Sequence, residues 1–349
     1  MNALSHKNNF DLLRICAAIF VIITHAYALR GLPEHDVLFH ISQATTSFSR
    51  FGLWIFFVIS GYLVTASAWR SVSVVSYIAK RVLRIMPAFI IVIFLSVLCL
   101  GPLVTTLSFA NYFQHPITWA YLKALLVFRI QYNLPGVFEQ NLYPGAVNGS
   151  LWTIPYEIFL YILPLCLTLL GTLKKVAIVF LFVLWIICIY AVYNYASFLD
   201  LHTMPFLLLN MWHVVNFAIF FIAGSIIYLL PDNMKIARIG WIIPLALWAI
   251  SWFTPYAVIL SYIFVPIMII NFAYQTPYVR IPAHIGDVSY GMYLYAFPIQ
   301  QIIMFLTHGT LSVSGLIILT ICIIIPIAWL SWHLVEKPAL SFKRFFSHV

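Results

Sequence analysis

Three ionisable side chains lie within stretches that are otherwise apolar, and their spacing suggests acid–base chemistry. Arg14 and His25 belong to LLRICAAIFVIITHAY, and Glu157 lies in NGSLWTIPYEIFLY. On a helix, the eleven steps from Arg14 to His25 return to nearly the same face, about 16 Å further along the axis. An ionisable group near the centre of a bilayer costs at least about 2.5–3.5 kcal/mol, so such groups are mostly functional. These three residues are therefore the first candidates for an active site.

The depths of His25 and Glu157 predict that the two side chains meet. If both helices cross a membrane, His25 lies about 6 Å and Glu157 about 10 Å from the same surface. A carboxylate beside an imidazole fixes its tautomer and raises its basicity, which would make His25 a general base. The alternative is a hydrogen-bonded structural histidine near a helix end. Asp11, one turn before Arg14, is placed to pair with it, although Arg14 could instead snorkel to lipid headgroups.

A second group of cations occurs in YIAKRVLRIMP, which we expect to form a short helix in the loop before the third span. Arg81 and Arg84 are three residues apart on one helical face, and Lys80 is adjacent. Two guanidinium groups on one face suit a phosphate-bearing ligand, because each can bind oxyanions with two hydrogen bonds. The alternative is a basic anchor at the cytoplasmic face of a membrane.

The composition indicates whether the protein that positions these residues folds in water or in a membrane. The 349 residues are 64% hydrophobic and 8% charged, whereas ordinary soluble domains are about 25% charged. Continuous apolar runs of about 18 or more residues are long enough to cross a bilayer as helices, and they lack the alternation of a membrane β-barrel. The fold class is therefore an all-α polytopic membrane protein. The five cysteines show no paired spacing, so we expect small buried residues, without a disulfide framework or metal site.

We expect about ten transmembrane helices. The spans lie near Leu12–Leu29, Phe51–Ala68, Ile85–Val104, Leu151–Leu170, Val176–Tyr193, Phe206–Leu230, Ile239–Phe253, Tyr256–Phe272, Val288–Leu306 and Val313–Leu334. The seventh and eighth meet at Thr254-Pro255 and would form a tight hairpin or a re-entrant pair. The first span has no cleavage site, so we expect it to be retained. The loop from Thr105 to Ser150 contains WAYLKALLVFRIQYNL, either an interfacial helix or packed loop.

The lysines and arginines predict the orientation. With the N-terminus in the cytoplasm, fourteen of the 18 fall in inner segments, and only Arg30, Arg50, Lys123 and Arg129 fall in outer ones. Cytoplasmic loops carry such an excess, so both termini are expected in the cytoplasm. The net charge of +9 is then explained by topology and by anionic membrane lipid, without nucleic acid.

Five motifs appear in a fixed order along the chain: FDLLRICAAIFVIITHA, FFVISGYLV, AKRVLRIMPAF, NGSLWTIPYEIFLY and VSYGMYLYAFPIQ, followed by WHLVEKPAL near the end. This set resembles the acyltransferase-3 family of integral membrane enzymes over nearly the whole chain. The resemblance implies transfer of an acyl group, usually acetyl, from cytoplasmic acyl-CoA across the membrane to a hydroxyl of an exported or lipid-linked carbohydrate. It implies no permanently bound cofactor, and residues 1–349 are expected to be one transmembrane domain without a C-terminal hydrolase-type extension.

The resemblance also implies roles for individual residues. The essential histidine of the family corresponds to His25, its first-span arginine to Arg14 and its fourth-span acid to Glu157. Its inner arginine pair corresponds to Arg81 and Arg84. Many members carry a histidine where this chain has Ala296, which leaves Tyr293 and Tyr295 as the polar groups there.

The expected mechanism places the acyl-CoA phosphates on Arg81 and Arg84, with Lys80 and Arg14 near the mouth. His25, oriented by Glu157, deprotonates the acceptor hydroxyl or first takes the acyl group itself. Ser60 and the amides around Gly61 are the candidate oxyanion donors. The alternative function is a multi-helix transporter of a glycan or small anion, because intramembrane His, Glu and Arg also build carriers. The sequence does not specify an oligomeric state.

Overall fold

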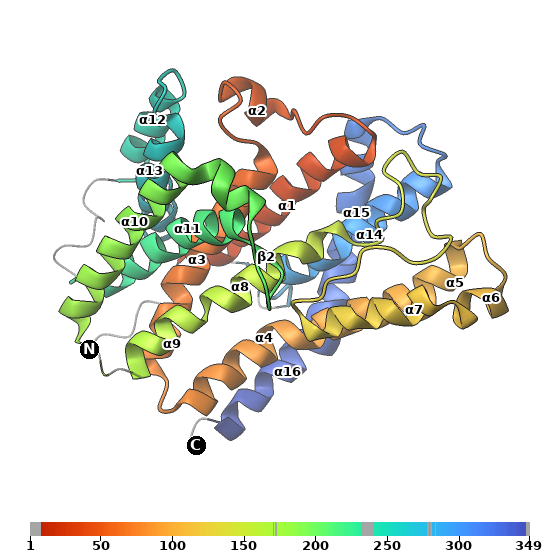
Figure 1. Ribbon diagram of the computed structural model, residues 1–349, viewed down its shortest axis with the longest axis horizontal. Coiled ribbons are helices and arrows are strands. Elements are labelled where there is room, and N and C mark those ends of the chain that lie inside the picture. Colours follow the sequence, from red (N-terminus) through yellow and green to blue (C-terminus); the bar gives the residue numbers. More distant parts are fainter. Residues whose placement is uncertain are drawn as a thin grey trace.

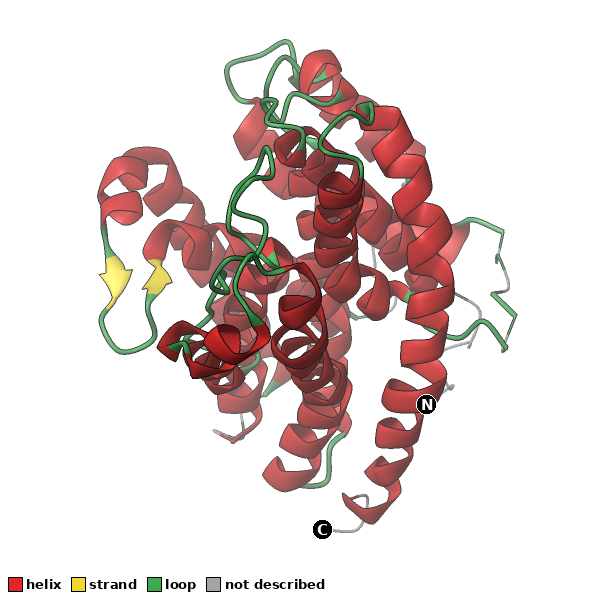
Figure 2. Cartoon of the chain, turned by 90° about the vertical axis from the view of Figure 1, so that its right-hand side faces the viewer, coloured by secondary structure: helices red, strands yellow, loops and turns green. Residues whose placement is uncertain are grey.

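The computed structural model describes residues 8–346 except 170, 172, 232–239, 278, 280 and 283. The described chain is almost entirely helical (Figures 1 and 2). Its strands, β1 (Thr203–Met204) and β2 (Leu209–Asn210), form a small antiparallel hairpin at the edge of the molecule (Figure 2). Within the described residues, eight helical stretches are long and apolar enough to cross a membrane. The chain is therefore a polytopic membrane protein, as its composition predicts.

A helix occupies each of the ten expected positions. These helices are α1 (Phe10–Leu29), α3 (Phe48–Arg70), α4 (Val74–Leu95), α8 (Ile154–Leu160) with α9 (Ile162–Leu169), α10 (Lys174–Leu201), α11 (Met211–Leu229), α12 (Ile242–Ser251), α13 (Ala257–Gln275), α14 (Ser289–Leu306) and α15 (Val313–Ser331). The described part of α12 spans only about 15 Å, half of a hydrocarbon core of about 30 Å. It is held to α13 where Trp248 Nε1 donates to Ser261 Oγ at 2.9 Å, so the two helices form a hairpin.

Shorter elements connect these helices. They are α2 (Val37–Ile41), α5 (Gly101–Val104), α6 (Phe109–Gln114), α7 (Pro116–Ala120), α16 (Lys337–Ser341), the 3₁₀ helices η2 (Tyr121–Leu126), η3 (Gly149–Thr153) and η6 (Phe342–Phe346), and the π-helices η1 (Ser96–Leu100) and η5 (Trp332–Glu336). The two π-helices continue α4 and α15 without interruption, so the described helical stretches run from Val74 to Val104 and from Val313 to Phe346.

Helix α3 forms the centre of the bundle, where it packs between α1 and α11 (Figure 1). Its contact with α11 depends on glycine: a Cβ atom added at Gly61 would lie 1.9 Å from the backbone oxygen of Phe221. Small residues let membrane helices approach closely enough for polar contacts across the interface. Thr65 Oγ1 donates to Ser225 Oγ at 2.8 Å in this interface.

The third span differs from its expected start at Ile85. Lys80, Arg81 and Arg84 do not lie on a separate short helix but in the first turns of α4, which begins at Val74. Their charges make this part of the helix resemble a loop in the sequence. Basic side chains near a helix end can, however, reach polar surroundings or ion-pair partners while the backbone stays helical.

The fourth span also begins differently, because the preceding loop is folded into the bundle along α14. Gln301 Nε2 donates to the carbonyl of Ala146 at 2.7 Å, and Asn148 Nδ2 donates to the carbonyl of Leu294 at 2.9 Å. Leu294 lies only five residues from the start of α14, about 8 Å along its axis. The fourth span therefore starts deep within the bundle rather than at a membrane surface.

The loop piece from Trp119 to Leu134 is helical only as far as Leu126, the end of η2. Val127 then adopts a positive φ of 64° and ends the helix. Tyr121 and Ala124 are buried, so this piece packs on the protein, as the loop alternative anticipated. The expectation that the cysteines are buried is wrong for three of them, since they face away from the bundle: Cys99, Cys166 and Cys322 are exposed.

We predict that Gly61→Ala lowers the free energy of unfolding by about 1–3 kcal/mol, the usual cost of overpacking. The added methyl group would collide with backbone of α11 that cannot rotate away. Thermal unfolding of the purified protein in detergent measures the change. Gly315→Ala is the matched control, because its nearest neighbours are side-chain atoms of Leu311 and Ser312 at 3.1 and 3.2 Å. Equal losses in the two variants would contradict the close-contact explanation.

Candidate active site

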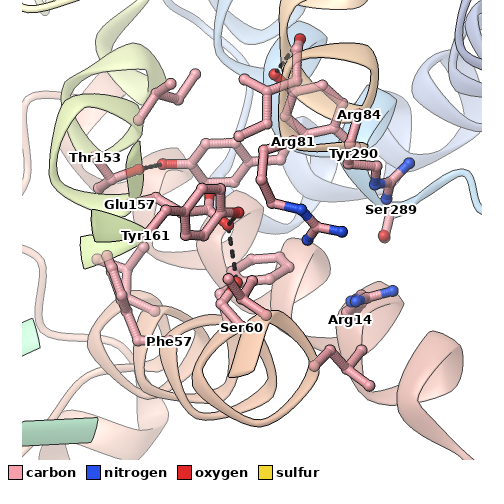
Figure 3. Close-up of a pocket in the computed structure, with 17 residues that line it drawn as sticks. Arg14, Phe57, Ser60, Arg81, Arg84, Thr153, Glu157, Tyr161, Ser289 and Tyr290 are labelled. Atoms are coloured by element: carbon pink, nitrogen blue, oxygen red, sulfur yellow. Dashed lines mark hydrogen bonds between the residues drawn. The ribbon is translucent and has the colours of Figure 1, made fainter. Parts of the chain in front are cut away.

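A cavity of about 840 Å³, including the part open to solvent, lies between α1, α3, α4, α8 and α14 (Figure 3). It extends from three arginines to Thr153 and Tyr293. Its polar lining residues are Arg14, Ser60, Arg81, Arg84, Thr153, Glu157, Tyr161, Ser289, Tyr290 and Tyr293. The structure thus brings six predicted site residues to one cavity: Arg14, Ser60, Arg81, Arg84, Glu157 and Tyr293.

An ion network, formed by Arg14, Arg84, Asp287 and Glu336, borders one end of this cavity. Asp287 Oδ2 lies 2.5 Å from Arg84 Nη2 and 3.5 Å from Arg14 Nη1. Arg84 Nη1 also lies 3.3 Å from Glu336 Oε2, and the Glu336 side chain is only 1% exposed. These contacts bring the first turns of α1, the middle of α4, the start of α14 and the end of η5 together on one side of the bundle, which we call the basic side.

Asp287 lies before α14, and its charge depends on this network. Burial disfavours the carboxylate, but the guanidinium groups of Arg84 and Arg14 and the Ser289 hydroxyl outweigh that effect and lower its pKa below the usual value. Asp287 therefore stays ionised between the two arginines. The predicted Arg14–Asp11 contact is also present, at 3.4 Å, although Asp11 is 58% exposed.

The two predicted phosphate-binding arginines differ in their surroundings. Arg84 is bonded to two carboxylates, so its charge is already neutralised within the protein. Arg81 forms no ion pair among the described residues; its guanidinium carbon lies 5.8 Å from the centre of the Tyr161 ring. Its Nε is buried without a hydrogen-bond partner in the described chain, and its guanidinium points into the cavity (Figure 3). Of the described cations that line the cavity, Arg81 is thus the one available to an anionic ligand.

Lys80 does not join this site. Its Nζ donates to Ser71 Oγ at 3.0 Å, and the residue is not among those that line the cavity. The reason is helical geometry, since Lys80 precedes Arg81 by one residue and the two point about 100° apart.

The expected pairing of Glu157 with His25 is wrong. One carboxylate oxygen of Glu157 accepts hydrogen bonds from Ser60 Oγ at 2.8 Å and from the Tyr161 hydroxyl at 2.5 Å. His25 Nδ1 has no hydrogen-bond partner in the described chain. These bonds also engage the Ser60 hydroxyl, which the sequence offered as an oxyanion donor.

The depths of the two residues explain this difference. Thr24, next to His25, accepts a hydrogen bond from the backbone N–H of Ser49 at 2.8 Å. Ser60, the partner of Glu157, lies eleven residues further along α3, about 16 Å toward the basic side. The sequence-based depth of Glu157 assumed that the fourth span begins at the outer surface, whereas it begins deep within the bundle.

His25 lies beyond the far end of the cavity. Its ring makes an edge contact with Phe297, with the ring centres 5.3 Å apart. Phe297 follows Tyr293 by four residues on α14, a separation of about 6 Å. The Tyr293 hydroxyl donates to the carbonyl of Ser150 at 2.8 Å and lies 2.5 Å from Thr153 Oγ1. About one helical turn, with the Tyr293 and Phe297 rings, therefore separates the cavity from the imidazole.

Sequence reasoning missed the two acids of the ion network and the tyrosine that binds Glu157. Asp287 directly precedes the motif VSYGMYLYAFPIQ, and Glu336 lies within WHLVEKPAL. Each of these two carboxylates lies at the edge of an apolar run, and this position was the available signal. Arg84, in the basic part of the third span, is the partner of both. Tyr161 could be inferred from its position four residues after Glu157, on the same helical face.

Two of the comparisons with known proteins name acyl or acetyl transfer. The sequence profile of the family described as "Acyltransferase domain" matches residues 7–336. A protein of Shigella phage Sf6 named "O-acetyl transferase" is 30% identical over 346 residues, which cover 96% of this chain and 97% of that protein. "Nodulation protein 10" of Rhizobium leguminosarum bv. viciae is 29% identical over 372 residues, 97% of this chain and 94% of that protein. No solved structure matches.

We predict that Arg84→Gln destabilises the protein by about 3–5 kcal/mol, the cost of removing one partner from a buried ion pair. Glu336 would then be left buried without a described cation. Arg81→Gln, one turn earlier on the same helix, should change stability by less than about 1 kcal/mol, because it breaks no ion pair. Thermal unfolding measures both. A larger loss for Arg81→Gln than for Arg84→Gln would show that the network is assigned to the wrong arginine.

Proposed function

Because the chain belongs to the acyltransferase-3 family, we propose that this membrane acyltransferase moves an acyl group, usually acetyl, from cytosolic acyl-CoA to a carbohydrate hydroxyl on the outer side. The phage relative is named an O-acetyl transferase, which supports acetyl as the group and oxygen as the acceptor atom. A transporter, the alternative from sequence, does not fit membership of an acyltransferase family. We place the protein in the cytoplasmic membrane as a single catalytic domain.

The observation that carries the proposal is a cavity with Arg81, which has no ion pair among the described residues, at one end and His25 one turn beyond the other. Arg81 would bind the phosphates of the donor, because its charge is not compensated by a carboxylate in the described chain. Arg84 and Arg14 would act indirectly by shaping the mouth through Asp287.

The pantetheine arm of the donor is extended and carries two amide groups. The length of α1 between Arg14 and His25, about 16 Å, is similar to the reach of such an arm. Ser60 and Glu157 lie along this path and line the cavity. The bonded Glu157 carboxylate retains acceptor capacity for an amide N–H, so we assign it a role in donor binding.

His25 is the proposed general base. Its buried Nδ1 has no partner in the described chain, so it can accept a proton from a hydroxyl brought beside it. The alkoxide oxygen forms its bond to the thioester carbon, the carbon–sulfur bond breaks, and the proton passes from the imidazole to the CoA thiolate. A covalent acyl-imidazole intermediate is the alternative route, in which His25 attacks the thioester first.

Membrane vesicles test the proposal directly. Inside-out vesicles containing the protein and native surface glycan, supplied with ¹⁴C-acetyl-CoA, should accumulate alkali-labile label on the glycan. His25→Ala should lower this transfer by at least about 100-fold, as for loss of a general base, with an unchanged melting temperature. Label on glycan from the folded His25→Ala variant would refute the assignment. Label on the native protein that is released by neutral hydroxylamine and is absent from the variant would select the covalent route.

The donor site gives a separate prediction. Arg81→Ala should raise the apparent KM for acetyl-CoA by about tenfold or more, the loss expected for a charge-assisted contact to phosphate, while kcat changes little. Lys80→Ala is the matched control, since Lys80 is adjacent but does not line the cavity. Equal effects in both variants would mean that the basic residues act only through general attraction of the donor.

A further inference from the structure

Two hollows on the side of the bundle opposite the basic side share Tyr132 and Trp152 and together form one groove, which we call the outer groove. Their volumes, including open solvent, are about 1090 and 810 Å³. His213, in the first turn of α11, lines one of them. Gly149, at the start of the fourth span, lines the other.

The outer groove carries an uncompensated positive charge. Lys123 and Arg129 line it, both are exposed, and neither has an ion pair among the described residues. The other two outer cations are engaged elsewhere, Arg30 with the carbonyl of Gly309 and Arg50 with that of Thr45. Basic residues are disfavoured in outer loops. Two of the four in one groove therefore point to an anionic ligand.

The remaining lining suits a sugar. The aromatic residues Tyr132 and Trp152 line both hollows, and Gln131 and Asn133 add amide groups. His213 Nδ1 is buried and has no hydrogen-bond partner in the described chain. No described lining residue is acidic; Asp200 lies close to α11, where its side chain accepts a hydrogen bond from Asn210 at 3.2 Å, but it does not line the groove.

The ring of Phe297 contacts both Gly149, which lines the outer groove, and His25. Gly149 packs against Phe297 so closely that an added Cβ atom would lie 2.6 Å from the ring. Phe297 contacts the His25 ring on α1 and the Tyr143 ring, at centre distances of 5.3 and 6.1 Å. Tyr143 also lines the groove. A ligand there would lie next to the proposed base.

We propose that the outer groove binds an anionic saccharide, the acceptor of the transfer, with its phosphate or carboxylate on Lys123 and Arg129 and a sugar ring on Tyr132 and Trp152. This inference rests on the proposed function, because it identifies the groove with the acceptor site. It goes beyond that function because it specifies an anionic acceptor, whereas acyl transfer to a hydroxyl requires no charge on the acceptor.

Binding can be measured without any acyl donor. The purified full-length protein in phosphatidylcholine nanodiscs is mixed separately with glucose, glucose 1-phosphate and glucuronic acid, and saturation-transfer NMR reports each bound sugar. At least one anionic sugar should bind about fivefold more tightly than glucose, as expected for two exposed ion pairs. The stronger of the two anionic sugars identifies phosphate or carboxylate as the preferred group.

The variant Lys123→Gln with Arg129→Gln should remove this preference. Lys174→Gln with Lys175→Gln is the matched control, since it removes the same charge from exposed residues at the start of α10. Equal signals from all three sugars, or a preference that survives in the groove variant, would overturn the proposal. Binding of an anionic sugar without acetyl transfer would refute the proposed function but support the outer groove as an anionic-saccharide site. Acetyl transfer without a preference for anionic sugars would support the function but refute this site.

Discussion

Burial of charge at the basic side is the constraint on which the rest of this structure depends. An uncompensated buried charge costs several kcal/mol, so a buried arginine requires carboxylates within reach. Arg84 obtains them from two distant parts of the chain, Asp287 before α14 and Glu336 at the end of η5. Arg14, in the first turns of α1, contacts the same Asp287 carboxylate. Four helical segments must therefore converge at one point, and this convergence fixes one end of the cavity.

The same constraint separates two arginines that look equivalent in sequence. Arg81 and Arg84 lie one turn apart on α4, yet only Arg84 faces the converging carboxylates. Arg81 faces the cavity and the ring of Tyr161. An arginine neutralised inside the protein gives rigidity, whereas one without a carboxylate partner among the described residues keeps its charge for a ligand. The structural and ligand-binding interpretations of this basic segment thus apply to different residues.

The positions of the helices could be predicted from the sequence, because the length of an apolar run is set by the thickness of the membrane. Arg14 and Glu157 could be named because ionisable groups stand out in apolar segments. Arg81 and Arg84 could be named because two guanidinium groups share one helical face. Ser60 and Tyr293 were expected from the motifs that contain them. The pairing of these residues could not be predicted. Arg84 and Asp287 are 203 residues apart, and no periodicity links them. The partner of Glu157 was missed because counting residues from a helix end gives depth only when that end lies at the surface.

The deep start of the fourth span has a consequence for chemistry across a membrane. Hydrogen bonds from Asn148 and Gln301 hold the preceding loop inside the bundle, and this loop brings Gly149 against Phe297. The outer groove and the cavity therefore end on opposite sides of a thin partition built from Phe297, Tyr293 and neighbouring residues. A hydroxyl from one side and a thioester from the other would need to cross only this partition to meet at His25. Movement of the Tyr293 and Phe297 rings would admit both reactants without opening a continuous aqueous path through the bilayer.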